Sequence, residues 1–122
     1  MILAVDKAAA RENEELGVYS LSLGGTQAGV EWIISLQLPL DISEQDILLG
    51  QDTYAITTST CATHYGGVLG WGFWPDGFFL DLENEAAESL GLESKVSFRV
   101  PGAGDISAKI EAGLTRILGC HL

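Results

Sequence analysis

The strongest pattern along the chain is a regular alternation of apolar and polar positions between Tyr65 and Leu82. Two alternating stretches, Val68 to Trp74 and Phe78 to Leu82, flank the tetrapeptide Trp74-Pro75-Asp76-Gly77. Proline is preset for the second position of a type I turn, and glycine accepts the left-handed conformation that follows it. The segment is therefore predicted to form a β-hairpin with a buried apolar face on each strand. The side chains expected there are Leu69, Trp71 and Phe73 on the first strand and Phe78, Leu80 and Leu82 on the second.

The first fifteen residues are predicted to begin with a strand. Ile2 to Ala8 is apolar enough for a strand, and the charged residues Arg11 to Glu15 are expected to form a turn. A short helix over residues 8–15 remains an alternative. Good helix formers occupy that segment, and it is too short for periodicity to decide.

Two alternating segments follow. Leu16 to Leu23 is expected to form a half-buried strand that stops at Gly24-Gly25. Val30 to Leu38 alternates without a break until Pro39 removes a backbone donor. The core positions expected from this pattern are Tyr19, Leu21 and Leu23 in the first strand and Val30, Trp32, Ile34, Leu36 and Leu38 in the second.

The segments on either side of the hairpin are shorter. Thr53 to Thr58 is predicted to form a β-branched strand, and residues 58–67 form a polar loop that leads into the hairpin. After the hairpin, Asn84 is expected to cap a short helix that ends at Gly91. Lys95 to Val100 then returns to strand, with Val96, Phe98 and Val100 facing inward.

The last element is predicted to be a helix from Asp105 to about Leu118, with an apolar stripe that needs a sheet face to cover. The order of elements has no repeated β-α-β alternation, which argues against a parallel sheet. We therefore expect an α+β fold: one domain over residues 1–122, in which an antiparallel β-meander packs against the C-terminal helix. The apolar stripe consists of Ile106, Ile110, Leu114, Ile117 and Leu118.

Charge narrows the range of partners. The 122 residues include 17 Asp and Glu but only 6 Lys and Arg, giving a net charge of −11. Such a chain repels phosphates, so a nucleic-acid partner is not expected. A basic macromolecule would be attracted, although acidity that only maintains solubility is the simpler interpretation.

The cysteines and the N-terminus point to an ordinary cytoplasmic protein. Cys61 and Cys120 lie far apart and lack a C-x-x-C partner, which argues against a disulfide framework or a cysteine-rich zinc site. The first residues lack both a basic leader and a long apolar segment, and no apolar run is long enough to span a membrane. We expect no membrane association, no metal and no cofactor.

Two segments carry residue types that are found in active or metal sites. Cys61 and His64 stand three residues apart, and a thiolate beside histidine is a known nucleophile arrangement. Cysteine-dependent enzymes usually recruit the histidine from elsewhere in the fold, so catalysis here is the weaker interpretation. The acidic segment between Pro39 and Asp52 lacks the alternating oxygen ligands of a calcium loop. Within it, Ser43 and Asp46 resemble a capping box for a single helical turn ending near Gly50.

Three stretches together resemble the immunity protein 10 family of bacterial polymorphic toxin systems: LLGQDTYAI, then HYGGVLGWGFWPDGFFLDLENEAAESLGL, then KVSFRV. The resemblance covers the chain from Asp41 onward. It implies a non-enzymatic protein that binds and neutralises a toxin encoded beside it. A small-molecule-binding or enzymatic domain that uses the loop around Cys61 and His64 is the alternative, and a homo-oligomer, such as a homodimer, with a purely structural role is a third.

Charge density suggests where a basic toxin would be held. Four carboxylates lie within a dozen residues, with no Lys or Arg among them. We therefore hypothesise a contact surface in which these acidic residues lie near a tight Tyr-Gly-Gly turn. The residues of this hypothesis are Asp41, Glu44, Asp46, Asp52, Tyr65, Gly66 and Gly67.

Overall fold

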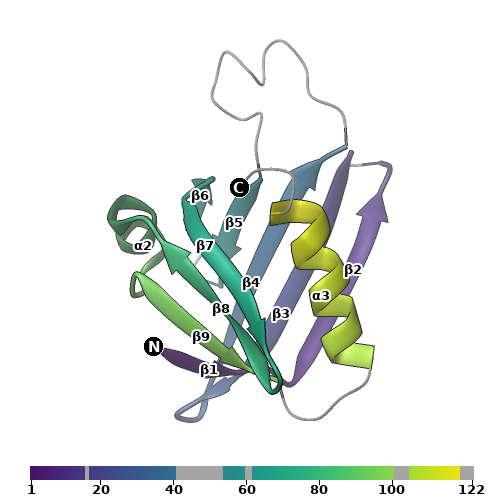
Figure 1. The fold of residues 1–122 in the computed structure, drawn as a ribbon. Coiled ribbons are helices and arrows are strands. Elements are labelled where there is room, and N and C mark those ends of the chain that lie inside the picture. The colour runs from purple at the N-terminus through teal and green to yellow at the C-terminus, as the bar shows by residue number, and fades with distance from the viewer. Residues whose placement is uncertain (16, 41–53, 60–61, 101–104, 119–122) are drawn as a thin grey trace.

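The computed structural model describes residues 1–15, 17–40, 54–59, 62–100 and 105–118 (Figure 1). These residues contain nine strands and two helices. The strands are β1 (Ile2–Ala4), β2 (Lys7–Asn13), β3 (Val18–Gln27), β4 (Val30–Pro39), β5 (Ala55–Thr58), β6 (Thr63–Tyr65), β7 (Val68–Trp74), β8 (Gly77–Leu82) and β9 (Lys95–Arg99). The helices are α2 (Asn84–Leu90) and α3 (Asp105–Leu118).

The strands form two sheets. Strands β2 to β6 follow one another in a five-stranded antiparallel meander, and the four-stranded sheet has the order β1-β9-β8-β7. Within the second sheet β7, β8 and β9 are antiparallel, and only β1 pairs in parallel, with β9. The predicted α+β class, with an antiparallel meander and a C-terminal helix that packs on it, is confirmed. The division into two sheets was not predicted.

The N-terminal segment is not the single strand expected from Ile2 to Ala8. It changes sheet between two neighbouring residues: the Val5 N–H donates to the Arg99 carbonyl at 2.8 Å, and the Asp6 N–H donates to the Gly24 carbonyl at 2.9 Å. The short helix expected over residues 8–15 is wrong, because β2 continues to Asn13, and the charged turn expected from Arg11 to Glu15 is limited to residues 14–15. Since β2 is an edge strand of its sheet, its charged side chains can remain in solvent.

Strand β3 also runs further than expected. The pair Gly24-Gly25 was predicted to stop the strand, but both residues pair with β4 and the strand ends at Gln27. A side chain at Gly25 would collide with the Ala4 carbonyl oxygen. Glycine at this position therefore lets the end of β1 lie close against the larger sheet.

The hairpin is confirmed, but the first strand is placed differently. A register shift between Val68 and Gly70 moves Leu69 out of the alternation, so Val68 is buried and Leu69 is 66% exposed. Phe73 lies next to the turn of the hairpin and is also exposed. The return strand is as predicted, with Phe78, Leu80 and Leu82 all buried.

The core lies between the two sheets and α3. In Figure 1 the four-stranded sheet and α3 lie side by side over the same face of the five-stranded sheet. Phe78 stacks on Phe98 with 4.4 Å between ring centroids, and Trp32 of the larger sheet approaches Phe98 at 6.1 Å. The predicted stripe of α3 is buried at Ile110, Leu114, Ile117 and Leu118, with Ile106 at its margin.

Four smaller expectations have different outcomes. Residues 63–65 of the predicted loop form β6, because they pair with β5. Glu83 rather than Asn84 occupies the N-cap position of α2, whereas Gly91 closes the helix in the left-handed conformation as predicted. Val30, expected in the core, is 67% exposed beside the β3–β4 turn. The helical turn predicted between Pro39 and Gly50 lies outside the described residues.

Candidate partner-binding surfaces

The residues predicted to contact a partner divide into two groups. Four of them, Asp41, Glu44, Asp46 and Asp52, lie outside the described residues, as does Cys61. The turn Tyr65-Gly66-Gly67 is described, and it carries the chain from β6 of the larger sheet to β7 of the smaller one. The structure therefore places only the turn, and the contact surface stays a hypothesis.

This turn is held by backbone hydrogen bonds from both sides. The Gly66 N–H donates to the Tyr54 carbonyl at 2.8 Å, and the Gly67 carbonyl accepts from the Glu83 N–H at 2.8 Å. Both glycines have positive φ, 70° and 98°. A Cβ on Gly67 would lie 2.6 Å from the Cβ of Ala86. The glycines thus have a structural role, whereas the Tyr65 side chain is 44% exposed.

Tyr54 fixes the same junction from inside. Its side chain is buried at 3% exposure, and its Oη accepts a hydrogen bond of 2.9 Å from the Val68 N–H. Burial raises the pKa of the phenol; the bond from Val68 opposes the rise, and the Glu83 carboxylate adds to it. The net pKa is above the ordinary 10.0, so Tyr54 is neutral at physiological pH and serves the fold.

The described residues offer no site for metal chemistry. His64 is half-buried on β6, opposite Ile56, and would contact any side chain added at Gly67. No group of three His, Cys, Asp or Glu in the described ranges is arranged to hold a metal ion. Within the same ranges, no helix has the length and apolar character needed to cross a membrane.

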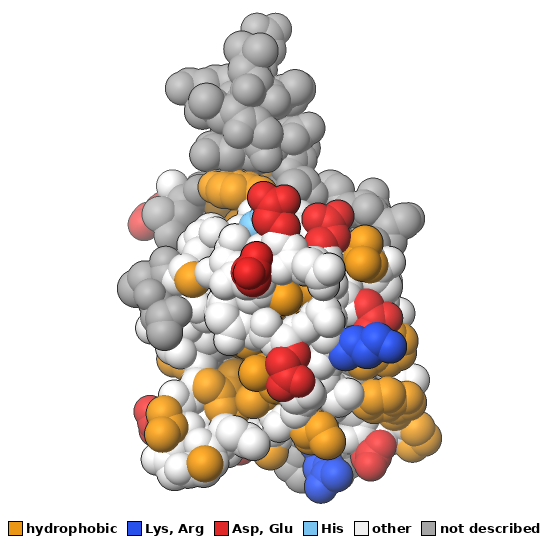
Figure 2. Space-filling view, turned by 90° about the vertical axis from the view of Figure 1, so that its left-hand side faces the viewer, with side chains coloured by type: hydrophobic (Ala, Val, Ile, Leu, Met, Phe, Trp, Pro, Cys, Tyr) orange, Lys and Arg blue, Asp and Glu red, His pale blue; other side chains and the backbone are white. Residues whose placement is uncertain are grey.

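An acidic cluster covers α2. Glu83, Glu85 and Glu88 are exposed, and residues 83–94 contain no Lys or Arg. Figure 2 shows Asp and Glu side chains gathered in the upper half of the face that carries α2. Because α2 packs against β6, this cluster lies beside the Tyr65-Gly66-Gly67 turn. We refer to Glu83, Glu85 and Glu88 as the α2 cluster.

The sequence analysis treated this segment only as a helix. The signal that would have identified the cluster is the run of twelve residues, 83–94, that contains four acids and no base. These acids also have a role within the fold, since carboxylates near a helix N-terminus are stabilised by the unpaired N–H groups there. The fourth acid of the run, Glu93, forms an ion pair of 3.2 Å with the N-terminal ammonium group.

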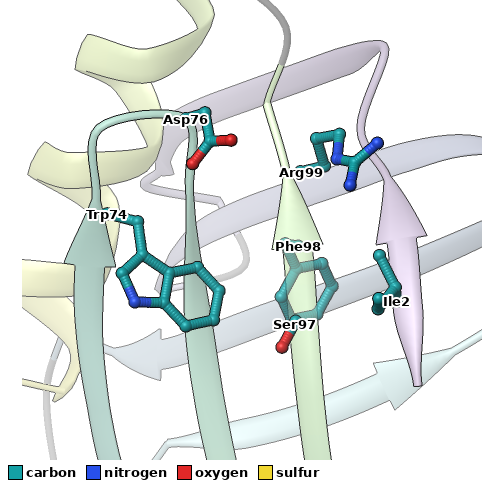
Figure 3. Close-up of a pocket in the computed structure, with 6 residues that line it drawn as sticks. All are labelled: Ile2, Trp74, Asp76, Ser97, Phe98 and Arg99. Atoms are coloured by element: carbon teal, nitrogen blue, oxygen red, sulfur yellow. The ribbon is translucent and has the colours of Figure 1, made fainter.

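The outward face of the four-stranded sheet carries exposed apolar side chains around a groove (Figure 3). Trp74 is 47% exposed and Ile2 is 58% exposed, and they lie on either side of β9. Asp76 and Arg99 lie at one end of the groove. The lining residues are Ile2, Trp74, Asp76, Ser97, Phe98 and Arg99.

The outward face of the five-stranded sheet is different. Many of its side chains carry hydroxyl groups, which pair across strands: Ser22 Oγ lies 3.1 Å from Ser35 Oγ, and Thr57 Oγ1 lies 3.2 Å from Thr63 Oγ1. Ile33 is 45% exposed on this face, beside a hollow of about 180 Å³. Lys7 lies over Gly24 at the β2 edge, within 2.6 Å of where a Cβ would stand. This face therefore combines neutral hydroxyl groups with basic side chains.

Comparison with known proteins gives one result. No curated protein and no solved structure matches the chain. The sequence model of the family described as immunity protein 10 matches residues 4–106. The match includes the N-terminal strands and reaches the start of α3, so it extends beyond the segments that first suggested the resemblance. Membership of this family suggests neutralisation of a cognate toxin and a non-enzymatic role. Because the match spans most of the 122 residues of the chain, this chain belongs to the immunity protein 10 family.

Proposed function

We propose that this protein binds and neutralises a cognate bacterial toxin in the cytoplasm of the cell that produces both, without catalysing a reaction. Family membership is the observation that supports this proposal most strongly. We further propose that the toxin presents a basic surface, as a nuclease domain does. The net charge of −11 supports this second step.

The distribution of charge within the described residues gives the second step more support. Ion pairs in this part of the chain involve only Glu12, with Arg116, and Glu93, with the N-terminal ammonium group. No residue of the α2 cluster forms an ion pair with another described residue. Uncompensated carboxylates on one surface create a field that accelerates association with a basic protein. The proposed contact surface therefore consists of the α2 cluster, the neighbouring Tyr65-Gly66-Gly67 turn and the acidic residues Asp41, Glu44, Asp46 and Asp52.

The first experiment tests neutralisation itself. The toxin encoded beside this gene is expressed alone and together with the protein, and growth is measured. The proposed function predicts that co-expression restores growth and that the purified proteins form a complex. Growth arrest in the presence of correctly folded protein, with no complex detected, would contradict it.

The second experiment tests the charge of the toxin surface. Replacing the α2 cluster by Gln should slow association with the toxin several-fold at low ionic strength and weaken its dependence on salt. The matched control replaces Glu14, Glu15 and Glu31 by Gln, which changes the net charge equally but removes exposed acids of the β2–β3 turn and of the start of β4. The control should slow association less.

The four acids at positions 41, 44, 46 and 52 are tested in the same way. Their replacement by Asn or Gln should also slow association while the melting temperature stays near the wild-type value. Association rates that equal the wild-type rate at low ionic strength for both acidic variants would exclude these surfaces. The search would then move to the exposed sheet faces.

A further inference from the structure

The groove on the four-stranded sheet is formed by small residues between large ones. Strand pairing places Gly77 between Trp74 and Arg99, and Ser97 between Phe79 and Ile2. Since neither Gly77 nor Ser97 fills the space above the sheet, a hollow of about 170 Å³ remains between Trp74 and Ile2. Its size is below that of typical sites for drug-sized ligands, roughly 300 to 1,000 Å³.

The large side chain at the margin of the groove is held in place before any partner binds. The rings of Trp74 and Phe79 lie 5.4 Å apart at an angle of 37°. Phe79 in turn lies over Gly72, where an added Cβ would be 2.8 Å from the ring. A Trp that is already ordered loses little side-chain entropy when it is buried by a partner. Exposed Trp residues with this support are common energetic centres of protein interfaces.

The charges around the groove favour one occupant over another. Strand β8 begins at the groove, where Gly77 pairs with Trp74, and its other end leads directly into α2, so one strand connects the groove to the α2 cluster. The groove itself has mixed charges, with Asp76 and Arg99 at its end and Asp81 paired in register with Lys95. A second copy of this chain would bring another charge of −11 towards the α2 cluster, whereas a basic protein would be attracted.

We propose that the groove receives one apolar side chain from the basic surface of the toxin, with Trp74 and Ile2 closing on it from both sides. This inference rests on the proposed function and adds a location for the binding energy. The α2 cluster then speeds the encounter, and the groove slows dissociation. Residues that are buried at the centre of an interface affect the dissociation rate more than residues at its charged margin.

The experiment compares two ways of disabling the groove. Trp74→Ala removes one wall, and Ser97→Leu fills the floor while leaving Trp74 in place. Each variant should raise the Kd for the purified toxin by about 30-fold or more, the loss typical of a central interface residue, mainly through faster dissociation. The control is Val30→Ala, which truncates an apolar side chain that is also exposed but lies on the other sheet, and it should change the Kd less than about threefold.

The possible results separate the inference from the function it rests on. If the wild-type protein does not bind the toxin, the proposed function fails. If the wild type binds and both groove variants bind equally well, the groove inference alone is overturned. A wild-type dimer that Trp74→Ala converts to a monomer would also overturn it, because a second copy would then be the occupant. Melting curves establish whether each variant is folded. If Trp74→Ala does not fold, the affinity of Ser97→Leu alone decides the test.

Discussion

The two sheets share one core but present different surfaces to solvent. On the five-stranded sheet many outward side chains carry hydroxyl groups that pair across strands, as Ser22 does with Ser35, and Ile33 lies exposed beside a hollow that Lys7 also lines. On the four-stranded sheet the outward side chains include Trp74, Phe79 and Ile2 around a groove. The acids of α2 follow directly from β8 of this second sheet.

This difference indicates where a partner could gain binding energy. Covering paired hydroxyl groups removes little apolar area from water and breaks their contact with solvent, so the gain is small. Covering Trp and Ile removes much more apolar area, at roughly 25 cal/mol per Å². The smaller sheet, which exposes Trp74 and Ile2, therefore has more of the composition of an interface than the larger sheet, where Ile33 lies among paired hydroxyl groups and Lys7.

The largest effect we predict concerns what the two sheets share. Leu114 is fully buried where α3 covers the larger sheet. Leu114→Ala should reduce the free energy of unfolding by about 2 to 5 kcal/mol, because it removes apolar contacts and leaves a cavity. Chemical denaturation monitored by fluorescence and by circular dichroism measures this loss.

The matched control for this variant is Thr115→Ala, which changes an exposed residue of the same helix. It should change the stability by less than about 0.5 kcal/mol. If residues 1–122 form one domain, both spectroscopic signals should follow a single transition in every variant. A loss below about half a kcal/mol for Leu114→Ala would show that α3 does not dock on this core.

The second prediction concerns the turn that joins the two sheets. Gly67→Ala should cost about 2 to 4 kcal/mol, because it combines a left-handed backbone with a collision against Ala86. Gly17 also has positive φ, 67°, but an added Cβ there would meet nothing within 4 Å. Gly17→Ala should therefore cost only about 1 kcal/mol. The stability of both variants is measured by thermal and chemical denaturation. Equal losses for Gly67→Ala and Gly17→Ala would mean that the junction at Gly67 is not tightly packed.

How far the sequence predicts this fold depends on whether an element is set by its own residues. The alternation in β4 and β9 and the stripe of α3 were sufficient, because each depends on one period and a local end signal. The sheet change between Val5 and Asp6 was not predictable in this way. It depends on two distant carbonyl acceptors, those of Arg99 and Gly24. The exposure of Leu69 likewise depends on a bulge that the apolar pattern hides.

The candidate surfaces show the same limit. The acids of α2 were visible as a run in the sequence, although only the fold places them beside the Tyr65-Gly66-Gly67 turn. The groove had no sequence signal. It requires the N-terminal residue Ile2 to pair beside Ser97, through the one parallel pairing in the described part of the chain. Distant pairing of this kind is decided by the packing of both sheets and leaves no local pattern.

The third prediction uses the buried phenol that links the sheets. Tyr54→Phe should cost about 1 to 3 kcal/mol at neutral pH, because the buried Val68 N–H loses its acceptor. Since the folded state holds the phenolic proton more tightly than the unfolded chain does, the wild type should also lose stability as pH rises above about 10. The free energy of unfolding is measured from about pH 8 to about pH 11, on both sides of the ordinary tyrosine pKa. The loss of stability due to Tyr54 should appear in the wild type and in Tyr65→Phe but not in Tyr54→Phe. An identical pH dependence for all three would contradict the burial argument.

The smallest effect we predict tests the five-stranded face directly. Ser35→Ala removes one member of a half-buried hydroxyl pair on the sheet face opposite the core. The Ser22 hydroxyl can rotate towards water, so stability should change by only about 0.5 kcal/mol. Toxin affinity should stay within about twofold of the wild type, because a solvated face contributes little to a complex. Calorimetric titration of the toxin with Ser35→Ala measures this, with Trp74→Ala run in parallel. A large loss from Ser35→Ala, together with unchanged binding by Trp74→Ala, would reverse the comparison and assign the contact surface to the five-stranded sheet.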